Sequence, residues 1–404
     1  MSSGWKYYQL GNVLTLQRGF DLPERNRREG TIPIVSSSGI SGYHNVAKVS
    51  GPGVITGRYG TLGEVFYIRQ DFWPLNTTLY VRDFKGNDPL FLSYFLRTLN
   101  LARQNTAGAV PGLNRNALHL LPVCIPPLPT QRKIAAILSA YDDLVENNTR
   151  RIAILEEMAQ SLYRELFVHF RFPGHEKKGM VESPLGMIPE RWEVVKFSTA
   201  VEIDPPTRIP KEGEKPFVSM ANLSSVSMLI DSYEMRSGNG GSKFKNDDTL
   251  FARITPCLEN GKTGYVQFLP SDQAVAFGST EFIVLRSKTL CPEYVYLMAR
   301  SNEFRDNAIK SMTGATGRQR VQVSCFDKFL LAHPDTDTLA AFRELVAPIF
   351  GSIYILAQKN ANLRQTRDLL LPRLISGQVD VEELDIHIEG GTYESSGEPV
   401  TTVP

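Results

Sequence analysis

The fold of this 404-residue chain is decided by residues 129–170, PTQRKIAAILSAYDDLVENNTRRIAILEEMAQSLYRELFVHF. After Pro129 the stretch contains no proline or glycine, and its apolar residues follow a heptad spacing, which predicts one long helix with a seam for a partner helix. The seam consists of Ile134, Tyr141, Leu155 and Leu162, with the companions Ile137, Leu138, Leu144, Val145, Ile152, Met158, Ala159 and Leu166. Asn148 is its polar member, and a buried Asn in such a seam fixes register or orientation.

The partner helix is expected in the same chain, 208 residues further on. The same register gives Phe342, Ile349, Leu356, Leu363 and Leu370, with the companions Leu345, Val346, Ile353 and Leu374. We predict that the two helices pack against each other in antiparallel orientation; the alternative is that each helix packs only on its own domain. Pro348 lies inside the second helix and predicts a kink or break near Ala347, because proline lacks the helical N–H.

A long internal repeat accompanies the two helices. One copy opens at Trp5 and the other at Trp192, and each continues as short strand-like runs broken by Gly, Pro and Asn. Residues 53–65 and 248–266 both indicate a strand, a glycine-containing turn and a second strand. The expected order is a domain at 1–129, a spacer helix at 130–170, a linker at 171–188, a domain at 189–335, a second spacer helix at 336–377 and an acidic, disordered tail at 378–404. This is an α+β (mixed α/β) fold.

Composition narrows the class of protein. The net charge is +1, but residues 1–129 hold 13 Lys and Arg against 7 Asp and Glu, which permits nucleic-acid binding. No apolar run approaches the roughly 18 residues that a membrane span needs, and the four isolated cysteines indicate reduced thiols. We therefore expect a cytoplasmic protein.

Catalytic and metal-binding motifs are incomplete. Asp204-Pro-Pro-Thr207 resembles the Asp-Pro-Pro-aromatic motif of amino-methyltransferases but lacks the aromatic residue. Gly261-Lys-Thr263 resembles the end of a phosphate-binding loop, yet Pro256 replaces its first glycine. The six histidines have no ligand spacing. These absences favour a binding protein without catalytic or metal residues of its own.

Four features together resemble the specificity subunit of type I restriction–modification systems. They are the opening Pro-Glu-Arg-Trp192, the turn at 56–63 (TGRYGTLG), the run at 126–135 (PPLPTQRKIA) and the ending at 370–379 (LLPRLISGQV). The resemblance covers roughly residues 5–380. It implies two strand-rich target recognition domains separated by two long antiparallel coiled-coil helices, related by an internal pseudo-twofold repeat.

The resemblance also implies partners. The chain would read a bipartite target in double-stranded DNA, and its helices would dock two methyltransferase subunits, with a restriction/translocase subunit joining them. Catalysis and the cofactors S-adenosylmethionine, ATP and magnesium would belong to those partners. We expect the apolar residues Leu138, Val145, Phe167 and Phe170 to form the docking face of the helices.

DNA reading requires polar side chains on projecting loops. The candidates in the first domain are Ser36, Ser37, Ser38, Tyr43, His44, Asn45, Arg58, Tyr59, Asn76, Asn114 and Arg115. Those in the second are Asn222, Lys243, Arg253, Lys262, Arg318, Gln319 and Arg320. The alternatives are a target-recognition subunit of another multi-subunit methylation or defence system, and a two-domain scaffold with no DNA role.

Overall fold

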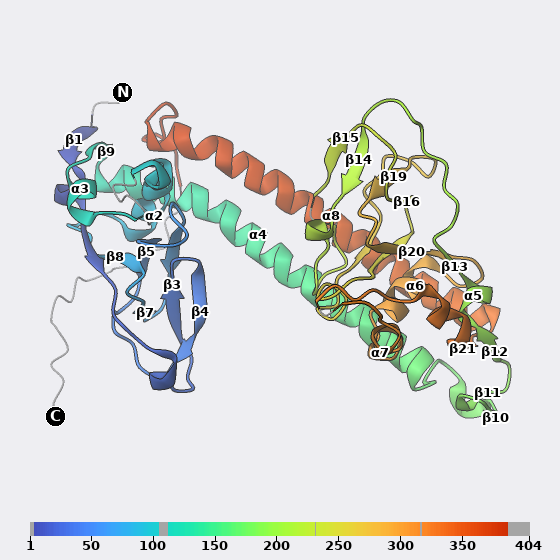
Figure 1. The fold of residues 1–404 in the computed structure, drawn as a ribbon. Coiled ribbons are helices and arrows are strands. Elements are labelled where there is room, and N and C mark those ends of the chain that lie inside the picture. The colour runs from blue at the N-terminus through green and yellow to red at the C-terminus, as the bar shows by residue number, and fades with distance from the viewer. Residues whose placement is uncertain (1–3, 105–111, 231, 316, 387–404) are drawn as a thin grey trace. The chain divides into compact units, whose positions relative to one another are not determined.

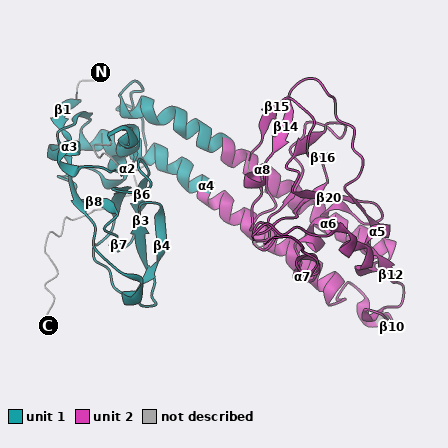
Figure 2. Cartoon of the chain, in the orientation of Figure 1, with its two compact units in different colours: residues 1–145, 362–404 teal, residues 146–361 magenta. Residues whose placement is uncertain are grey.

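The computed structural model describes residues 4–104, 112–230, 232–315 and 317–386. The chain divides into two compact units, one formed by residues 1–145 and 362–404 and the other by residues 146–361 (Figure 2). We call them unit 1 and unit 2. Each unit contains one strand-rich domain and a segment of both long helices.

Unit 1 is built on two sheets (Figure 1). A four-stranded antiparallel sheet has the order β2-β8-β5-β6, and a three-stranded sheet has the order β4-β3-β7, with β3 and β7 parallel. The strands are β2 (Thr15–Arg18), β3 (Ile32–Ser36), β4 (Gly39–His44), β5 (Gly53–Gly57), β6 (Val65–Ile68), β7 (Trp73–Pro74) and β8 (Thr78–Asp83). All five residues of β5 are buried, as expected for a central strand covered on both faces.

Unit 2 repeats this topology. Its first sheet has the order β13-β20-β17-β18, and its second has the order β15-β14-β19-β16 with β14 and β19 parallel. The strands are β13 (Val201–Ile203), β14 (Lys215–Val218), β15 (Glu234–Arg236), β16 (Ser242–Phe244), β17 (Thr249–Ala252), β18 (Thr263–Tyr265), β19 (Ala276–Gly278) and β20 (Phe282–Ser287). The internal repeat predicted from the sequence is therefore confirmed, and among the described residues β16 is the strand that unit 2 adds.

A short ladder closes each domain next to the long helices. In unit 1, β1 (Lys6–Gln9) pairs with β9 (Pro122–Ile125), and in unit 2, β12 (Glu193–Lys196) pairs with β21 (Leu330–His333). The short helices are α1 (Leu10–Val13), α2 (Pro89–Thr98) and α3 (Arg115–His119) in unit 1, and α5 (Phe197–Ala200), α6 (Pro292–Ala299) and α7 (Asn302–Lys310) in unit 2. The hairpin of β10 (Met180–Ser183) and β11 (Gly186–Pro189) lies in the predicted linker.

The two tryptophans that open the repeats pack on ends of the long helices. Trp5 lies against Gly377, where a Cβ would meet its ring at 3.0 Å and where φ is +70°. Glycine is required there on both counts. Trp192 is buried among aromatic rings, 5.8 Å from Phe167 and 5.7 Å from Phe172 between ring centroids. Each tryptophan thereby anchors its domain on the end of a long helix within the same unit.

The long helices are α4 (Leu128–Tyr163), which continues as a π-helical turn at Arg164–Val168, and α8 (Thr336–Ile375). They run antiparallel, as predicted. In unit 1, Arg367 of α8 donates to Asp142 of α4, and in unit 2 Asn148 Nδ2 donates to Asn360 Oδ1 at 3.0 Å. Asn148 and Asn360 are both buried. The sequence predicted Asn148 as a polar seam residue. It did not predict Asn360 as its partner, because the predicted register placed Leu356 at the position of α8 that corresponds to Asn148.

Several expectations about helix faces are wrong. The predicted seam residues Leu144, Met158 and Leu345 are about half exposed, at 51%, 49% and 53%. Conversely, Leu138 and Phe167 of the expected docking face are buried, and Val145 and Phe170 are partly buried. The Phe167 ring lies 4.6 Å from Tyr294 of the unit 2 domain and 4.8 Å from Phe342 of α8 between centroids, so this face packs on both the domain and the partner helix. A heptad pattern does not distinguish a helix partner from a domain core.

The break expected at Pro348 is absent, since α8 is one helix from Thr336 to Ile375. Pro348 is exposed, and so is Glu344, whose carbonyl loses its helical donor. Water can satisfy an exposed carbonyl, so the proline costs less here than it would in a buried helix interior.

Two other expectations need correction. By length and composition α8 could span a membrane, contrary to the estimate from apolar runs. However, its buried residues Phe342, Val346, Phe350 and Ile353 belong to the core of unit 2. The predicted disordered tail is ordered in its described part: Val381 is buried, and Lys133 Nζ donates to the carbonyls of Glu382 and Leu384. The rest of the tail, 387–404, lies outside the described residues.

We predict that losing one member of the Asn148–Asn360 pair lowers the free energy of unfolding more than replacing both members. Asn360→Leu removes the acceptor of a buried amide and should lower the free energy of unfolding by about 1–3 kcal/mol, whereas Asn148→Leu with Asn360→Leu should be near neutral. Urea unfolding of the full chain measures both, with the exposed Gln358→Leu as control. Equal losses in the single and double variants would contradict this prediction.

Candidate nucleic-acid interface

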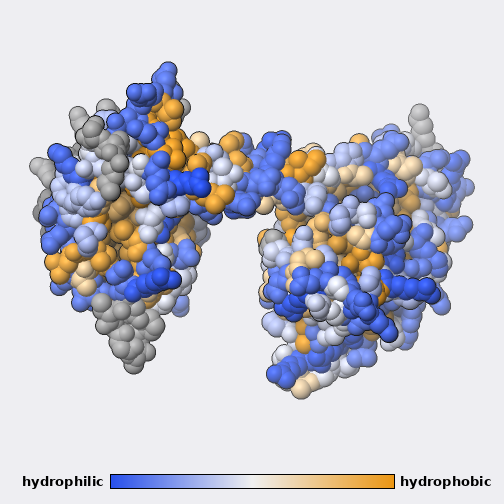
Figure 3. Space-filling view, turned by 90° about the horizontal axis from the view of Figure 1, so that it is seen from above, coloured by the Kyte–Doolittle hydropathy of each residue, from blue (hydrophilic) through white to orange (hydrophobic). Residues whose placement is uncertain are grey.

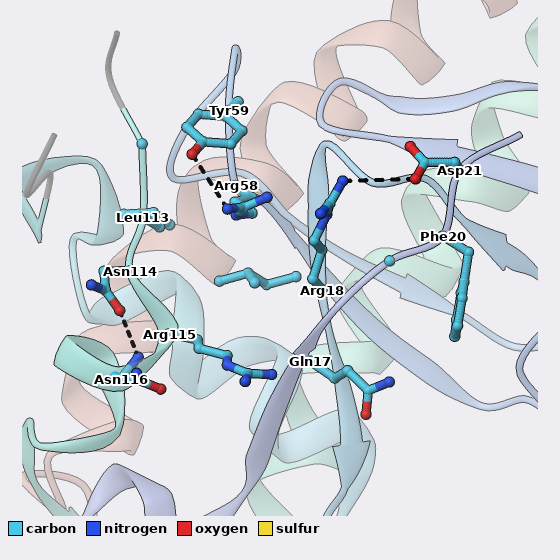
Figure 4. A pocket seen from close by; sticks show the side chains of 13 residues that line it. Gln17, Arg18, Phe20, Asp21, Arg58, Tyr59, Leu113, Asn114, Arg115 and Asn116 are labelled. Carbon is cyan, nitrogen blue, oxygen red and sulfur yellow. Dashed lines mark hydrogen bonds and ion pairs between the residues drawn. The ribbon is translucent and has the colours of Figure 1, made fainter. Parts of the chain in front are cut away.

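A polar cleft opens in unit 1 between the sheet β2-β8-β5-β6 and the start of α3 (Figure 4). Its volume is about 800 Å³. It is lined by residues that follow β2, by the turn after β5 and by the start of α3. The lining residues are Gln17, Arg18, Gly19, Phe20, Asp21, Arg58, Tyr59, Leu79, Gly112, Leu113, Asn114, Arg115 and Asn116. We call this cleft 1.

Cleft 1 is positively charged. It contains Arg18, Arg58 and Arg115 against one carboxylate, Asp21, and Figure 4 shows the three guanidinium groups around the same space. Arg18 lies 3.8 Å from Asp21. The Arg58 guanidinium lies 4.5 Å from the centroid of the Tyr59 ring, and such cation–π stacking orients the charge. A concave surface with excess positive charge concentrates anions.

Unit 2 carries a cleft at the corresponding place, which we call cleft 2. Its volume is about 610 Å³. Its lining residues are Asp204, Pro205, Pro206, Thr207, Arg208, Gly241, Ser242, Lys243, Arg253, Thr280, Phe282 and Val284. Three cations, Arg208, Lys243 and Arg253, again face one carboxylate, Asp204. The two clefts therefore have the same balance of charge.

The same parts of the fold line both clefts. Each cleft lies beside the residues that follow the first strand of its sheet and the residue that ends a buried central strand. Residues 2–157 match the type I restriction modification DNA specificity domain.

Relatives extend the likeness to most of the chain. The MjaIX specificity subunit of Methanocaldococcus jannaschii, from a type I restriction enzyme, is 24% identical over 329 residues, 77% of this chain and 74% of that protein. The MjaVIII specificity subunit of the same organism is 21% identical over 338 residues, 80% of this chain and 78% of that protein. Over most of its length the chain is similar to type I restriction–modification specificity subunits. The crystal structure of the type I S subunit from M. genitalium covers 93% of this chain and 97% of its own chain, with a TM-score of 0.60 and 13% identity. It shows that the fold is shared.

Four of the predicted DNA-binding residues line cleft 1: Arg58, Tyr59, Asn114 and Arg115. Asn114 also caps α3 by accepting from Asn116 N at 2.9 Å. Ser37 lies next to the same turn, against Gly57 and Gly60. Asn76 donates to Asp21 and so reaches the rim.

The remaining candidates of unit 1 lie on the β3–β4 hairpin. Ser36 and Ser38 interact with each other at 3.1 Å between their Oγ atoms, which stabilises the turn, and Tyr43 and Asn45 are exposed. His44 contradicts its predicted role. It is buried, its Nδ1 accepts from Arg28 N at 3.0 Å, and its ring packs edge-on against Trp73 at 5.5 Å. A buried, satisfied imidazole is part of the core and does not reach DNA.

In unit 2, Lys243 and Arg253 line cleft 2 as predicted, but other candidates are engaged elsewhere. Asn222 forms a capping box with Ser219 and donates to Ser232 Oγ at 2.8 Å. Lys262 Nζ donates to the Met220 carbonyl at 2.9 Å. Both side chains hold a loop together, so their predicted role in DNA reading is not supported by their contacts.

The Arg318–Arg320 cluster is divided. Arg318 is exposed, and the backbone of Gln319 pairs with Thr255. Arg320 makes a double hydrogen bond to Glu281, at 2.6 and 2.9 Å, which holds the pKa of Glu281 below its usual value. This carboxylate engages two of the three guanidinium nitrogens of Arg320, Nε and Nη2.

Sequence reasoning missed the segments after the first strands. Gln17, Arg18 and Asp21 line cleft 1, and Asp204, Thr207 and Arg208 line cleft 2. A signal was available, because both segments follow equivalent strands of the repeat. Asp204-Pro-Pro-Thr207 was considered only as a methyltransferase motif. Among the described residues no group of three His, Cys, Asp or Glu side chains could hold a metal ion.

We predict that acid weakens the wall of cleft 1 through His119. The Nε2 of His119 in α3 accepts from Leu16 N of β2 at 2.9 Å, which requires a neutral ring, and burial lowers the pKa of His119. The unfolded state, with an imidazole pKa of about 6.5, then takes up the proton more readily. Stability should therefore be lost as the pH falls below about 6.5.

Thermal unfolding between about pH 8 and about pH 5 measures this effect. His119→Gln keeps an acceptor but cannot titrate, so it should flatten part of the pH dependence, whereas the exposed His169→Gln should not. An unchanged profile in His119→Gln would contradict the assignment.

Proposed function

We propose that this chain is the non-catalytic, DNA-reading subunit of a type I restriction–modification assembly, and that each unit reads one half of a bipartite target. The observation that supports this most is the pair of clefts, one in each repeat, with three cations and one carboxylate each. Cations that neutralise phosphates supply most of the affinity for DNA, and the polar residues between them read base edges.

The long helices supply the docking surface and the spacer in this proposal. The exposed apolar side chains on α4 and α8 are Leu144 and Leu369 in unit 1, and Ile154, Met158, Leu345 and Ile355 in unit 2. Where the helices are visible in Figure 3, hydrophobic and hydrophilic groups alternate on their surface. Exposed apolar side chains in both units suit two methyltransferase subunits per chain. A restriction/translocase subunit completes the assembly.

Cofactors belong to the partners in this assignment. S-adenosylmethionine would be bound by the methyltransferase subunits, and ATP and magnesium by the restriction/translocase subunit. The target recognition domains would be residues 1–129 and 189–335, and the assembly would work in the cytoplasm. A target-recognition subunit of a different multi-subunit system would have the same clefts but other partners, so co-purification separates the two readings.

The primary test is the pattern of DNA methylation in the host. Deleting the gene should abolish methylation at one bipartite motif, and purified chain should bind a duplex with that motif with an affinity that falls steeply with salt. A scaffold without a DNA role would leave the methylation unchanged and bind duplexes negligibly. That outcome would overturn the proposal.

We predict that the docking face is apolar. Ile154→Glu and Leu345→Glu place charges on exposed side chains and should leave folding intact, but each should weaken capture of the methyltransferase by about tenfold or more. Gln358→Glu on the same helix is the control. Pull-down with the methyltransferase encoded next to this gene measures the effect, and undiminished capture by both Glu variants would exclude this face.

We also predict that the two halves of the target are read independently. Lys243→Ala should change the methylated motif only in the half-site read by unit 2, with about 1–3 kcal/mol less discrimination at one base pair. Sequencing the methylome of the variant strain gives the result. Relaxation in both halves together would argue against one half-site per unit.

A further inference from the structure

Arg58 and Arg253 occupy the same position in the two repeats. The backbone N–H of Arg58 donates to the Thr77 carbonyl at 2.8 Å, and its carbonyl accepts from Leu113 N at 2.9 Å. Arg253 repeats both bonds, donating to the Glu281 carbonyl at 3.0 Å and accepting from Val321 N at 2.9 Å. Each arginine directly follows a buried central strand, β5 or β17, and each lines its cleft. These matching backbone hydrogen bonds make Arg58 and Arg253 equivalent positions of the two repeats.

The polar residues around them differ between the repeats. In unit 1, Tyr80 of β8 lies opposite Gln17 on the neighbouring strand β2 and opposite Ile55 on the other neighbour, β5. In unit 2, Leu250 lies opposite Val284, and Asp204 N donates to the Val284 carbonyl. Gln17 and Asp204 are therefore equivalent.

Four residues further along the chain from Gln17 and Asp204, cleft 1 carries Asp21 and cleft 2 carries Arg208, which have opposite charges. Lys243 lies on β16, the strand that unit 2 adds. Among the polar side chains of the two clefts, the strand registers show one that is the same in both repeats, the arginine at position 58 or 253.

Neither arginine makes an ion pair within 4.0 Å among the described residues, although the charge of Arg253 acts on the carboxylates of Asp204 and Glu281 from beyond that distance. Arg18 and Arg320 are paired with Asp21 and Glu281, but no carboxylate oxygen of the described chain lies within 4.0 Å of Arg58 or Arg253. Arg58 contacts the ring and hydroxyl of Tyr59. The Nε of Arg253 is buried with no hydrogen-bond acceptor in the described structure. A guanidinium without a carboxylate within ion-pairing distance favours an anion in its cleft.

We propose that Arg58 and Arg253 each bind a phosphate of the DNA backbone, while the residues that differ between the clefts read bases. This inference rests on the proposed function. Two units that read different half-sites need different side chains toward the bases, but the phosphates are the same at every sequence. A guanidinium binds a phosphate with two parallel hydrogen bonds. The shared arginines fix the position of the DNA, and Gln17, Asp21, Arg208 and Lys243 give each cleft its selectivity.

The test measures binding of the full chain to its methylated motif and to duplexes altered in one half-site, from about 50 to about 300 mM salt. Arg58→Ala should lower affinity for every duplex by the same factor and reduce the slope of log affinity against log salt by about 0.9. Arg58→Ala with Arg253→Ala should reduce the slope by about twice as much. Arg58→Lys should restore most of the slope, since lysine also binds phosphate as a point charge. Arg103→Ala, exposed and outside the cleft, is the control.

The outcomes separate the alternatives. Gln17→Ala should change discrimination only in the first half-site and leave the salt slope unchanged. If Arg58→Ala and Arg58→Lys both relax selectivity at one base pair, Arg58 reads a base and the proposal is wrong. Unchanged affinity and slope in both variants would equally overturn it. Failure of the unmodified chain to bind DNA with any salt dependence would instead refute the proposed function.

Discussion

The structure depends on the antiparallel pairing of α4 and α8, two helices separated by more than a hundred residues of sequence. Within unit 1 the pairing is held by Arg367 and Asp142, and within unit 2 by the buried amides of Asn148 and Asn360. Apolar seams tolerate sliding by a helical turn, because one leucine substitutes for another. A buried amide does not, since a shifted register leaves its hydrogen bonds unmade. The polar pair therefore selects one register among those that the apolar contacts alone would allow.

Anchors between domain and helix use the same principle within each unit. In unit 1, the Tyr94 hydroxyl of α2 donates to Asp142 at 2.5 Å. The carboxylate that accepts from Arg367 of α8 therefore also binds a side chain of the domain. In unit 2, Glu156 of α4 accepts from Ser227 Oγ and Met228 N, both at 2.7 Å, and burial raises the pKa of Glu156. These directional contacts fix how each cleft faces its own helix segments.

Much of the architecture could be predicted from the sequence, because it is recorded in periodicity. The heptads and the shared opening tryptophans gave two helices, their orientation and the repeat. The clefts were predicted only in part. Arg58 and Arg253 follow recognisable strand runs, but Gln17 and Arg208 become neighbours of those arginines through strand pairing over long separations. His44, Asn222 and Lys262 have the residue types of DNA readers, yet burial and local hydrogen bonds engage them, and neither is visible in a linear sequence.

The ladder that closes each domain has a consequence for how such a chain can change. Pairing of Lys6 with Ile125 and of Glu193 with His333 brings the entry and exit of each domain together beside the helices. Everything between these points forms a closed loop of chain whose insertion requires only that its two ends meet. A different strand-rich domain with adjacent ends could occupy the same place and leave the Asn148–Asn360 alignment untouched. Recombination at one of these two short ladders would therefore exchange one cleft and leave the paired helices unaltered.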